Sequence, residues 1–409
     1  MLKITIPTNW EDDLISGVNK SPVDELYGKL TKDFIGGGRP SSNIPQVDQK
    51  KAASHISRIH KSGLKFNYLL NATCLNNVEL TTRGQKEIRY LLDWLNELGV
   101  QRCTVAIPYL LELIKKQYPK FKVYVSTSAR VDSLERAKHW EDLGADGIIF
   151  DSVSVNRNFR LIRQLRDGLK CELTLIANVN CLYECPFKNY HCLAISHASQ
   201  SISCGKGFFL DYSSLMCGYF RVKNPVNFIR ADWIRPEDIS LYENVGIDRI
   251  KLVDRSMPTE FITAITTAYV NRRYEGNLLD LFANCRKKIM YNKFTLFRKL
   301  KYFFHPLRIN LYQVSKIRDL TFDFFYIDNR SLDGFLDYFV KNDCTLKSCQ
   351  DCKHCQALAD KVIQFDHDLQ QKLIDKYEQY LDKVVSGDIF KYFINNRSIK
   401  NNENIINKS

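Results

Sequence analysis

The chain has 409 residues, of which 44% are hydrophobic and 26% are charged. These globular values exclude a mostly disordered or collagen-like chain, and the length predicts two or three domains. No apolar run reaches the roughly 18 to 20 residues that span a bilayer, and the N-terminal sequence lacks the apolar core of a signal peptide. We therefore expect a cytoplasmic protein, in which 13 cysteines indicate metal or catalytic sites more than disulfides.

Short apolar runs alternate with helical patterns over the first part of the chain. The runs are rich in Val, Ile, Phe or Tyr, as expected of strands covered on both faces of a sheet. The eight predicted strands are Lys3–Pro7, Lys65–Asn71, Cys103–Pro108, Lys122–Ser126, Gly147–Phe150, Glu172–Asn178, Asn227–Ala231 and Arg249–Val253. The helices predicted between them include Gln85–Leu98, Tyr109–Gln117, Ser133–Leu143 and Asn158–Gly168.

Eight strand–helix alternations over about 255 residues match the size of a (β/α)8 barrel. A doubly wound open sheet is the competing α/β interpretation. Neither GxGxxG nor GxxxxGK[ST] occurs, so the phosphate cradle of nucleotide-binding folds is missing from the sequence. We predict an α/β fold with a TIM-like (β/α)8 barrel at residues 1–280. A smaller, mainly helical, cysteine-containing C-terminal region follows at residues 281–409.

A first group of cysteines begins where the predicted strand Glu172–Asn178 ends. Its members are Cys181, Cys185, Cys192 and Cys217. Because barrels build their active sites at the C-terminal ends of strands, thiolates at this place suit an iron–sulfur cluster. Zinc accepts the same four thiolates, and ordinary buried cysteines without a metal are the third interpretation.

Two stretches of the chain resemble the peptidase U32 family. They are ANVNCLYECPFKNYHCLAISHAS and FIRADWIRPEDISLYENVGIDRIKLVDRSMPTEFITAITTAYVNRRYEGNLLDL. That TIM-barrel superfamily includes collagenase-like peptidases and oxygen-independent hydroxylation proteins, and the resemblance covers roughly residues 1–280. It implies a [4Fe-4S] cluster in the barrel, held by Cys181, Cys185, Cys192 and Cys217.

The spacing of the first cysteine group departs from that of the hydroxylation proteins, which leaves its fourth ligand open. Cys204 and Cys74 are the reserve candidates. A radical SAM enzyme is the closest rival interpretation. Those enzymes share the spacing CxxxCxxC, whereas here six residues separate the second and third cysteines, and the group comes late in the chain.

Polar residues at predicted strand ends are candidates for contact with a substrate. Asn178 and Asn180 follow one strand, and Arg230 flanks another. Lys251 and Arg255 lie on or just after the last strand. Cationic side chains at a barrel mouth favour an anionic substrate. Solvated or ion-paired side chains are the alternative for each of them.

The C-terminal region carries a second group, Cys344, Cys349, Cys352 and Cys355, in the sequence DCTLKSCQDCKHC. The CxxCxxC spacing resembles half of a ferredoxin motif and favours a second [4Fe-4S] cluster. Zinc, with His354 as a substitute ligand, and a metal-free site are the alternatives. Such a cluster would relay electrons to the barrel or stabilise the fold of the C-terminal region.

Residues 281–318 contain ten Lys or Arg and no Asp or Glu, so this segment holds most of the formal net charge of +13. Aromatic residues alternate with the basic ones, which is typical of surfaces that bind phosphates and stack on bases. RNA or an acidic peptide or substrate is the partner this predicts, and the surface of an anionic membrane would also fit. A helix with a basic solvated face and an aromatic core face is the alternative.

From these features we expect a U32-like iron–sulfur oxidoreductase. It would carry out oxygen-independent hydroxylation or a related modification of a small molecule, a peptide or an RNA base, with an electron donor or partner protein. A U32-type peptidase is the first alternative, although neither GxSxG nor HExxH occurs. A non-catalytic RNA- or peptide-binding partner protein with structural metal sites is the second.

Overall fold

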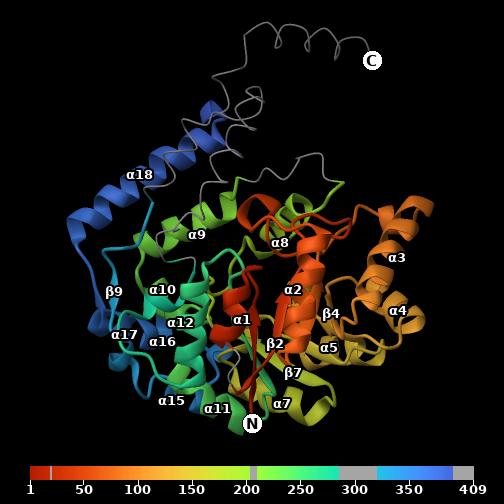
Figure 1. The fold of residues 1–409 in the computed structure, drawn as a ribbon. Coiled ribbons are helices and arrows are strands. Elements are labelled where there is room, and N and C mark those ends of the chain that lie inside the picture. Colours follow the sequence, from red (N-terminus) through yellow and green to blue (C-terminus); the bar gives the residue numbers. More distant parts are fainter. Residues whose placement is uncertain (19–20, 203–209, 284, 286–319, 390–409) are drawn as a thin grey trace, which may run out of the picture.

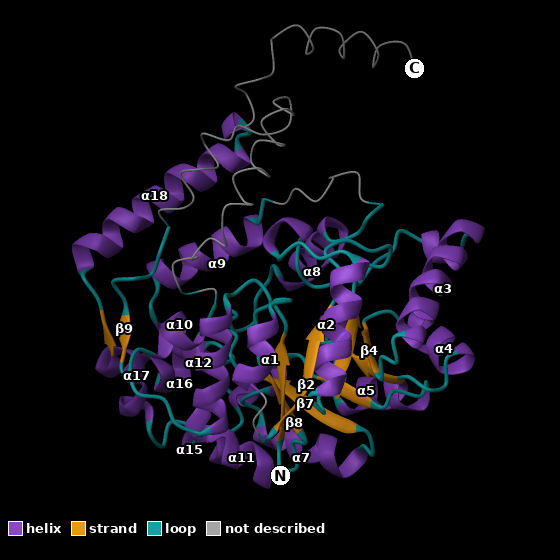
Figure 2. Cartoon of the chain, in the orientation of Figure 1, coloured by secondary structure: helices purple, strands orange, loops and turns teal. Residues whose placement is uncertain are grey.

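The computed structural model describes residues 1–18, 21–202, 210–283, 285 and 320–389. Eight parallel strands close into a barrel in which each strand pairs with the next in the chain and the last pairs with the first (Figures 1 and 2). The predicted (β/α)8 fold is therefore confirmed. The strands are β1 (Lys3–Pro7), β2 (Val23–Gly28), β3 (Lys65–Leu70), β4 (Arg102–Val105), β5 (Lys122–Val125), β6 (Gly147–Ile149), β7 (Glu172–Ile176) and β8 (Arg249–Lys251).

Helices surround the barrel and bury an apolar face against the strands. Helix α3, for example, places Ile88, Leu92 and Leu95 in the core at the spacing of an amphipathic helix. The barrel helices are α1 (Asp12–Val18), α2 (Gln49–Lys61), α3 (Thr82–Glu97), α4 (Pro108–Gln117), α5 (Leu134–Asp142), α6 (Ser152–Val155), α7 (Phe159–Gly168), α11 (Ile239–Asn244) and α12 (Thr259–Val270).

One predicted strand was wrong and one strand was missed. The predicted strand Asn227–Ala231 is the helix α10 (Val226–Arg230), which Pro225 begins with helical backbone angles. The missing strand is β2, whose sequence VDELYG contains two acidic residues and so lacks an apolar run. The barrel accepts Glu25 because its carboxylate pairs with Arg102 at 2.7 Å in the interior.

The connection between β7 and β8 is unusually long and carries the first cysteine group. It contains α8 (Lys188–Ala198), α9 (Tyr212–Lys223), α10 and α11. Helices α8 and α9 lie across the end of the barrel at which the strands finish (Figure 1). Cys181 and Cys185 precede α8, so the predicted place of this group at the barrel mouth is confirmed, although the preceding strand is the seventh and not the sixth.

The C-terminal region packs on the helices of that connection. Its α18 lies along α9, and its α17 packs on α10 (Figure 1). The elements are β9 (Tyr326–Ile327), α15 (Asp337–Lys341), α16 (Cys349–Cys352), α17 (His354–Val362), β10 (Ile363–Gln364) and α18 (His367–Val385). The predicted boundary between residues 280 and 281 stays a prediction.

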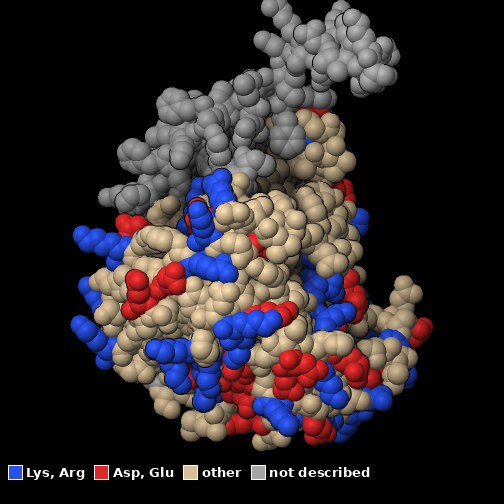
Figure 3. Space-filling model, turned by 90° about the vertical axis from the view of Figure 1, so that its right-hand side faces the viewer, with Lys and Arg blue, Asp and Glu red and all other residues tan. Residues whose placement is uncertain are grey.

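The basic and aromatic segment 281–318 falls almost wholly outside the described residues. Over the described surface in Figure 3, Lys and Arg alternate with Asp and Glu. No described helix has both the length and the apolar character that crossing a bilayer requires.

Candidate active site at the barrel mouth

Two buried cations line the mouth without a fixed anionic partner. Lys251 ends β8 and is 6% exposed, and its Nζ lies 3.9 Å from the ring centre of Tyr27. Burial lowers the pKa of Lys251 to about 7, and among the described residues it forms no ion pair. Arg255 is also buried, and its Nη1 has no hydrogen-bond partner in the described part of the chain. Both were predicted site residues, and the structure brings them together.

A glycine loop after β2 is fixed over this mouth. The Gly36 and Gly37 amides donate to Asp33 and Ser199 at 2.6 and 2.7 Å. A Cβ atom on Gly37 would lie 2.7 Å from the Asn71 side-chain oxygen, so only glycine fits here. Arg39 follows the loop and pairs with Asp254 at 2.9 Å.

Lys29 and Asp33 form a buried ion pair at the base of this loop, with Nζ and Oδ2 3.0 Å apart. The Tyr68 hydroxyl donates to the same carboxylate at 2.8 Å. Unlike Lys251, Lys29 therefore has its own counter-charge. Lys29, Asp33 and Arg39 were not predicted as site residues, because β2, the strand that leads to them, was missed.

The two predicted asparagines hold the backbone of the mouth. The Asn178 oxygen accepts from the Val253 amide at 2.7 Å, and its amide group donates to the Val253 carbonyl. The Asn180 oxygen accepts from Arg221 at 3.0 Å. Both side chains are buried in these contacts, so their geometry is that of positioning residues, and a direct role with substrate stays a prediction.

Three of the four predicted cysteine ligands lie together. The Cys217 thiol donates a hydrogen bond to Cys185 and lowers the pKa of Cys185 to about 6. Cys181 lies within electrostatic range of both, and burial raises its pKa to about 12. The Cys181 amide donates to Asp232 at 2.7 Å, which fixes the start of the cysteine loop.

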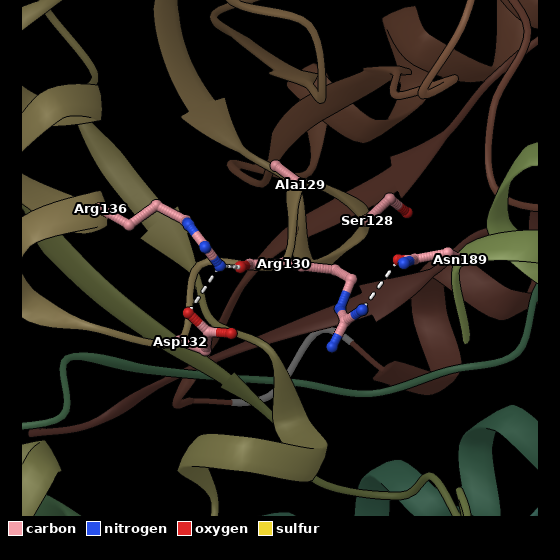
Figure 4. A pocket seen from close by; sticks show the side chains of 6 residues that line it. All are labelled: Ser128, Ala129, Arg130, Asp132, Arg136 and Asn189. Carbon is pink, nitrogen blue, oxygen red and sulfur yellow. Dashed lines mark hydrogen bonds and ion pairs between the residues drawn. The ribbon is translucent and has the colours of Figure 1, made fainter. Parts of the chain in front are cut away.

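The fourth predicted ligand, Cys192, lies on α8 beside a group of charges, of which Lys188 is also within electrostatic range of Cys181. Lys188 pairs with Asp151 at 3.0 Å, and Arg130 approaches the same carboxylate at 3.7 Å. These three and Arg39 are the charged groups nearest to Cys192. A polar cavity of about 410 Å³ opens here, and the Arg130 guanidinium donates to Asn189 across it at 2.8 Å (Figure 4).

The structure describes only one of the two reserve ligands. Cys74 lies on a loop against α8, where Gln200 donates to its carbonyl at 2.7 Å. Cys204 lies outside the described residues. No three His, Cys, Asp or Glu side chains in the described ranges surround a position for one metal ion. A cubane cluster binds each thiolate at a different iron, so its ligands need not converge on one point.

Arg230 is not at a strand end, and that prediction of its position was wrong. It ends α10, because the expected strand there is a helix. Its guanidinium lies near Cys352 and Cys355 of the second cysteine group, so the structure separates it from Lys251 and Arg255. A catalytic role for Arg230 stays a prediction.

Comparisons with known proteins decide the family. A model of peptidase family U32 matches residues 42–192. A protein of Methanocaldococcus jannaschii described as "Uncharacterized protease MJ1657" is 30% identical over 376 residues, which cover 89% of this chain and 99% of that protein. The chain belongs to peptidase family U32. The match to the family model ends at Cys192 and thus takes in three of the predicted barrel ligands.

Solved structures are similar in fold. The U32 peptidase Mk0906 matches with a TM-score of 0.48 at 23% identity, covering 62% of this U32 chain and 93% of that one. A thiamine phosphate pyrophosphorylase from Pyrococcus furiosus matches with a TM-score of 0.35 at 11% identity, covering 66% and 95%.

The family name suggests a hydrolytic site. In this U32 chain a hydroxyl, a histidine and a carboxylate follow one another in the order that a hydrolytic triad requires. The Thr8 hydroxyl lies 2.8 Å from Nε2 of His55, and Nδ1 of His55 lies 3.1 Å from Asp12. Thr8 is 0% exposed and is packed against Trp10. Burial lowers the pKa of His55 to about 4. The geometry therefore does not present the hydroxyl to a peptide.

Proposed function

We propose that this U32 chain is an iron–sulfur enzyme that carries out oxygen-independent hydroxylation, or a related redox modification, of an anionic substrate at the barrel mouth. The observation that carries the proposal is the gathering of Cys181, Cys185 and Cys217 beside a mouth with two buried cations that form no ion pair among the described residues. Perturbed groups of this kind in a concave site are typical of functional centres.

The donor set fits a cluster. Thiolates are soft ligands that select iron–sulfur groups or zinc. The hydrogen bond from Cys217 lowers the pKa of Cys185 and so favours its thiolate, and the cations of Lys188 and Arg221 lie close to Cys181. When bound, a cluster supplies one-electron redox chemistry at a potential set by such charges and hydrogen bonds.

The residues of the chain would bind and orient the substrate. Arg255 offers a free Nη1 for a carboxylate or phosphate oxygen, and Lys251 adds a point charge beside it. A pKa near 7 also lets Lys251 donate or accept a proton at neutral pH. The fixed loop at Gly36 and Gly37 closes part of the mouth and limits the entry of water.

The metal content of anaerobically isolated protein tests the proposal. We expect the double variant Cys181→Ala/Cys185→Ala to lose about four iron and about four sulfide ions per chain, because a [4Fe-4S] cluster would have lost two ligands. Elemental analysis, visible absorption and EPR measure this. Cys171→Ala, which removes a buried thiol beside Glu141, is the control and keeps the full content.

Peptide hydrolysis is the second candidate, favoured by the name of the family. Its candidate groups are Thr8, His55 and Asp12, although the Thr8 hydroxyl is buried. The same preparations separate the two functions. Peptide cleavage that survives in Cys181→Ala/Cys185→Ala and is lost in Thr8→Val would support the peptidase. Unchanged iron in the cysteine variant would contradict the iron–sulfur enzyme.

The basic and aromatic segment 281–318 is our proposed contact for RNA. We expect Lys299→Glu/Lys301→Glu to weaken binding of single-stranded RNA at least roughly tenfold and to reduce its salt dependence, since two phosphate contacts become repulsive. Lys372→Glu/Lys376→Glu, on the exposed face of α18, is the control of equal charge. Equal affinities of both variants in a titration with labelled RNA would contradict the assignment.

A further inference from the structure

The four cysteines of the C-terminal region occupy consecutive short turns. Cys344 begins a 3-10 turn, Cys349 and Cys352 are the two ends of α16, and Cys355 lies in the first turn of α17. Lys353 separates the two helices with a left-handed φ of 53°. Burial and then the thiols of Cys355, Cys352 and Cys349 raise the pKa of Cys344 to about 11, so the four sulfurs lie within electrostatic range of one another.

Buried polar nitrogens without partners lie near this quartet. The guanidinium donors Nε and Nη2 of Arg157 and Nε of Arg230, and the ring nitrogen Nε2 of His354, are buried and unpartnered among the residues that the structure describes. Arg157 lies beside Cys344 and Cys355, and Arg230 lies beside Cys352 and Cys355. Each arginine is therefore within electrostatic range of two of the four sulfurs.

The position of Arg157 is fixed by its surroundings. Its guanidinium carbon lies 4.4 Å from the ring centre of Trp233, 4.7 Å from that of Phe335 and 5.3 Å from that of Phe339. Its Nη1 donates to the Ile229 carbonyl at 2.5 Å. Cation–π contacts hold the plane of the guanidinium but offer no acceptor to its remaining N–H groups.

A buried guanidinium with unpaired donors is costly unless an anion accepts from it. The nearby Asp232 carboxylate accepts instead from the Ser152 hydroxyl and the Cys181 amide. Neutral thiols are weak acceptors and supply no charge. Four thiolates around a metal centre would supply both, because their summed negative charge exceeds the positive charge of a cubane core or a zinc ion. The arginines thus indicate that the quartet carries negative charge when it is complete.

We propose that Cys344, Cys349, Cys352 and Cys355 bind an iron–sulfur cluster whose negative charge is balanced by Arg157 and Arg230. Zinc accepts the same four thiolates, and the metal content of the isolated chain separates it from a cluster. Ligands from successive turns, as in C-x4-C-x2-C-x2-C, are also typical of a loop that wraps a cluster. This inference does not depend on the proposed function of the barrel.

The quartet lies within electrostatic range of the loop that carries two of the barrel cysteines. Tyr183, between Cys181 and Cys185 in the chain, is within electrostatic range of Cys344 and Cys349. Asp232 accepts from the Cys181 amide and also lies near Arg157. A redox centre in the quartet would therefore neighbour the proposed barrel centre, which a purely structural metal would not require.

The full chain, isolated without oxygen, tests the inference through two double variants. We expect Cys349→Ala/Cys352→Ala to lose about half of the iron and sulfide and to keep the EPR signal of the barrel cluster. Cys181→Ala/Cys185→Ala is expected to lose the other half. If the barrel holds no iron, the C-terminal variant still loses all of it, so failure of the proposed function and failure of this inference give different results.

A charge variant tests the role of the arginines with the cysteines intact. Arg157→Gln is expected to keep its iron and to shift the reduction potential of the C-terminal cluster to more negative values, because the reduced cluster loses a neighbouring cation. Arg163→Gln, on the exposed face of α7, is the control and leaves the potential unchanged. Iron that is unchanged in Cys349→Ala/Cys352→Ala, zinc lost in its place, or a potential unmoved by Arg157→Gln would overturn the inference.

Discussion

Replacing Lys251 by methionine is expected to stabilise the protein, by about 5 kcal/mol at pH 6 and about 2 kcal/mol at pH 9. Lys251 is 6% exposed, and burial is the main cause that lowers its pKa from 10.5 to about 7. Glu25 raises that pKa but does not offset the burial. Methionine has a similar length and carries no charge, so it removes the cost of the buried ammonium group.

The pH dependence follows from the direction of the shift. Below pH 7, Lys251 is protonated in both the folded and the unfolded chain, and the folded chain bears the full cost of the buried charge. Between pH 7 and 10.5 the unfolded chain binds more protons, so the wild type gains stability as the pH rises. The advantage of Lys251→Met should therefore shrink steadily over this range.

Urea unfolding of both proteins between pH 6 and 9 measures this difference. Lys120→Met, at an exposed position, is the control and should change the free energy of unfolding by less than about 0.5 kcal/mol at every pH. A destabilised Lys251→Met, or an advantage independent of pH, would show that an anion within the described fold already neutralises Lys251.

A buried charged residue that costs stability is expected to contribute to function. If Lys251 binds an anionic substrate, the bound anion raises the pKa of the ammonium group. Substrate affinity should then fall as the pH rises above 7. The same charge that destabilises the free protein would be neutralised in the complex.

The periodicity of the sequence was enough to predict the barrel fold but not to predict every strand in it. Seven of the strands were predicted, because residues buried on both faces of the sheet give short runs rich in Val, Ile or Tyr. The strand β2 was missed because Asp24 and Glu25 interrupt its apolar pattern. The residues that pair with them, Arg249 and Arg102, are distant in sequence. Asn227–Ala231 reads as a strand by composition, but Pro225 and its contacts with α17 make it a helix.

The site was predictable where it depends on one stretch of chain. Cys181 and Cys185 follow a strand directly, and any parallel barrel places them at its mouth. Cys217 joins them only through the packing of α9. The cationic lining depends on tertiary structure too, since Arg39 meets Asp254 across the mouth from the other end of the barrel sequence. Whether Lys251 is paired cannot be read from the strand that contains it.

Arg249, two residues before Lys251 on β8, is expected to have the opposite effect. Arg249→Met should destabilise the protein by about 3 to 5 kcal/mol at pH 7, because it leaves the carboxylates around it uncompensated. Arg249 is 2% exposed and donates to Glu172 at 2.6 Å, to Asp24 at 3.1 Å and to the Thr5 hydroxyl at 2.8 Å.

The loss of stability in Arg249→Met should be smaller at acidic pH. Burial acts to raise the pKa of Asp24, but the hydrogen bond and charge of Arg249 hold it below its usual value. A depressed carboxyl pKa stabilises the fold above the unfolded value of 3.8, and that contribution disappears as the pH falls through the folded pKa. The difference between wild type and Arg249→Met should thus be largest near pH 7 and smaller at pH 3.

Arg273→Met is the matched control, since it removes an ion pair with Glu275 that lies on the surface, and it should cost less than about 1 kcal/mol. A similar small cost for Arg249→Met would contradict the expectation. The contrast within β8 assigns its two interior cations to different tasks. Arg249 closes the start of the barrel with carboxylate partners, whereas Lys251, one layer nearer the mouth, forms no ion pair in the described structure, and its charge is the one that an anionic substrate is expected to neutralise.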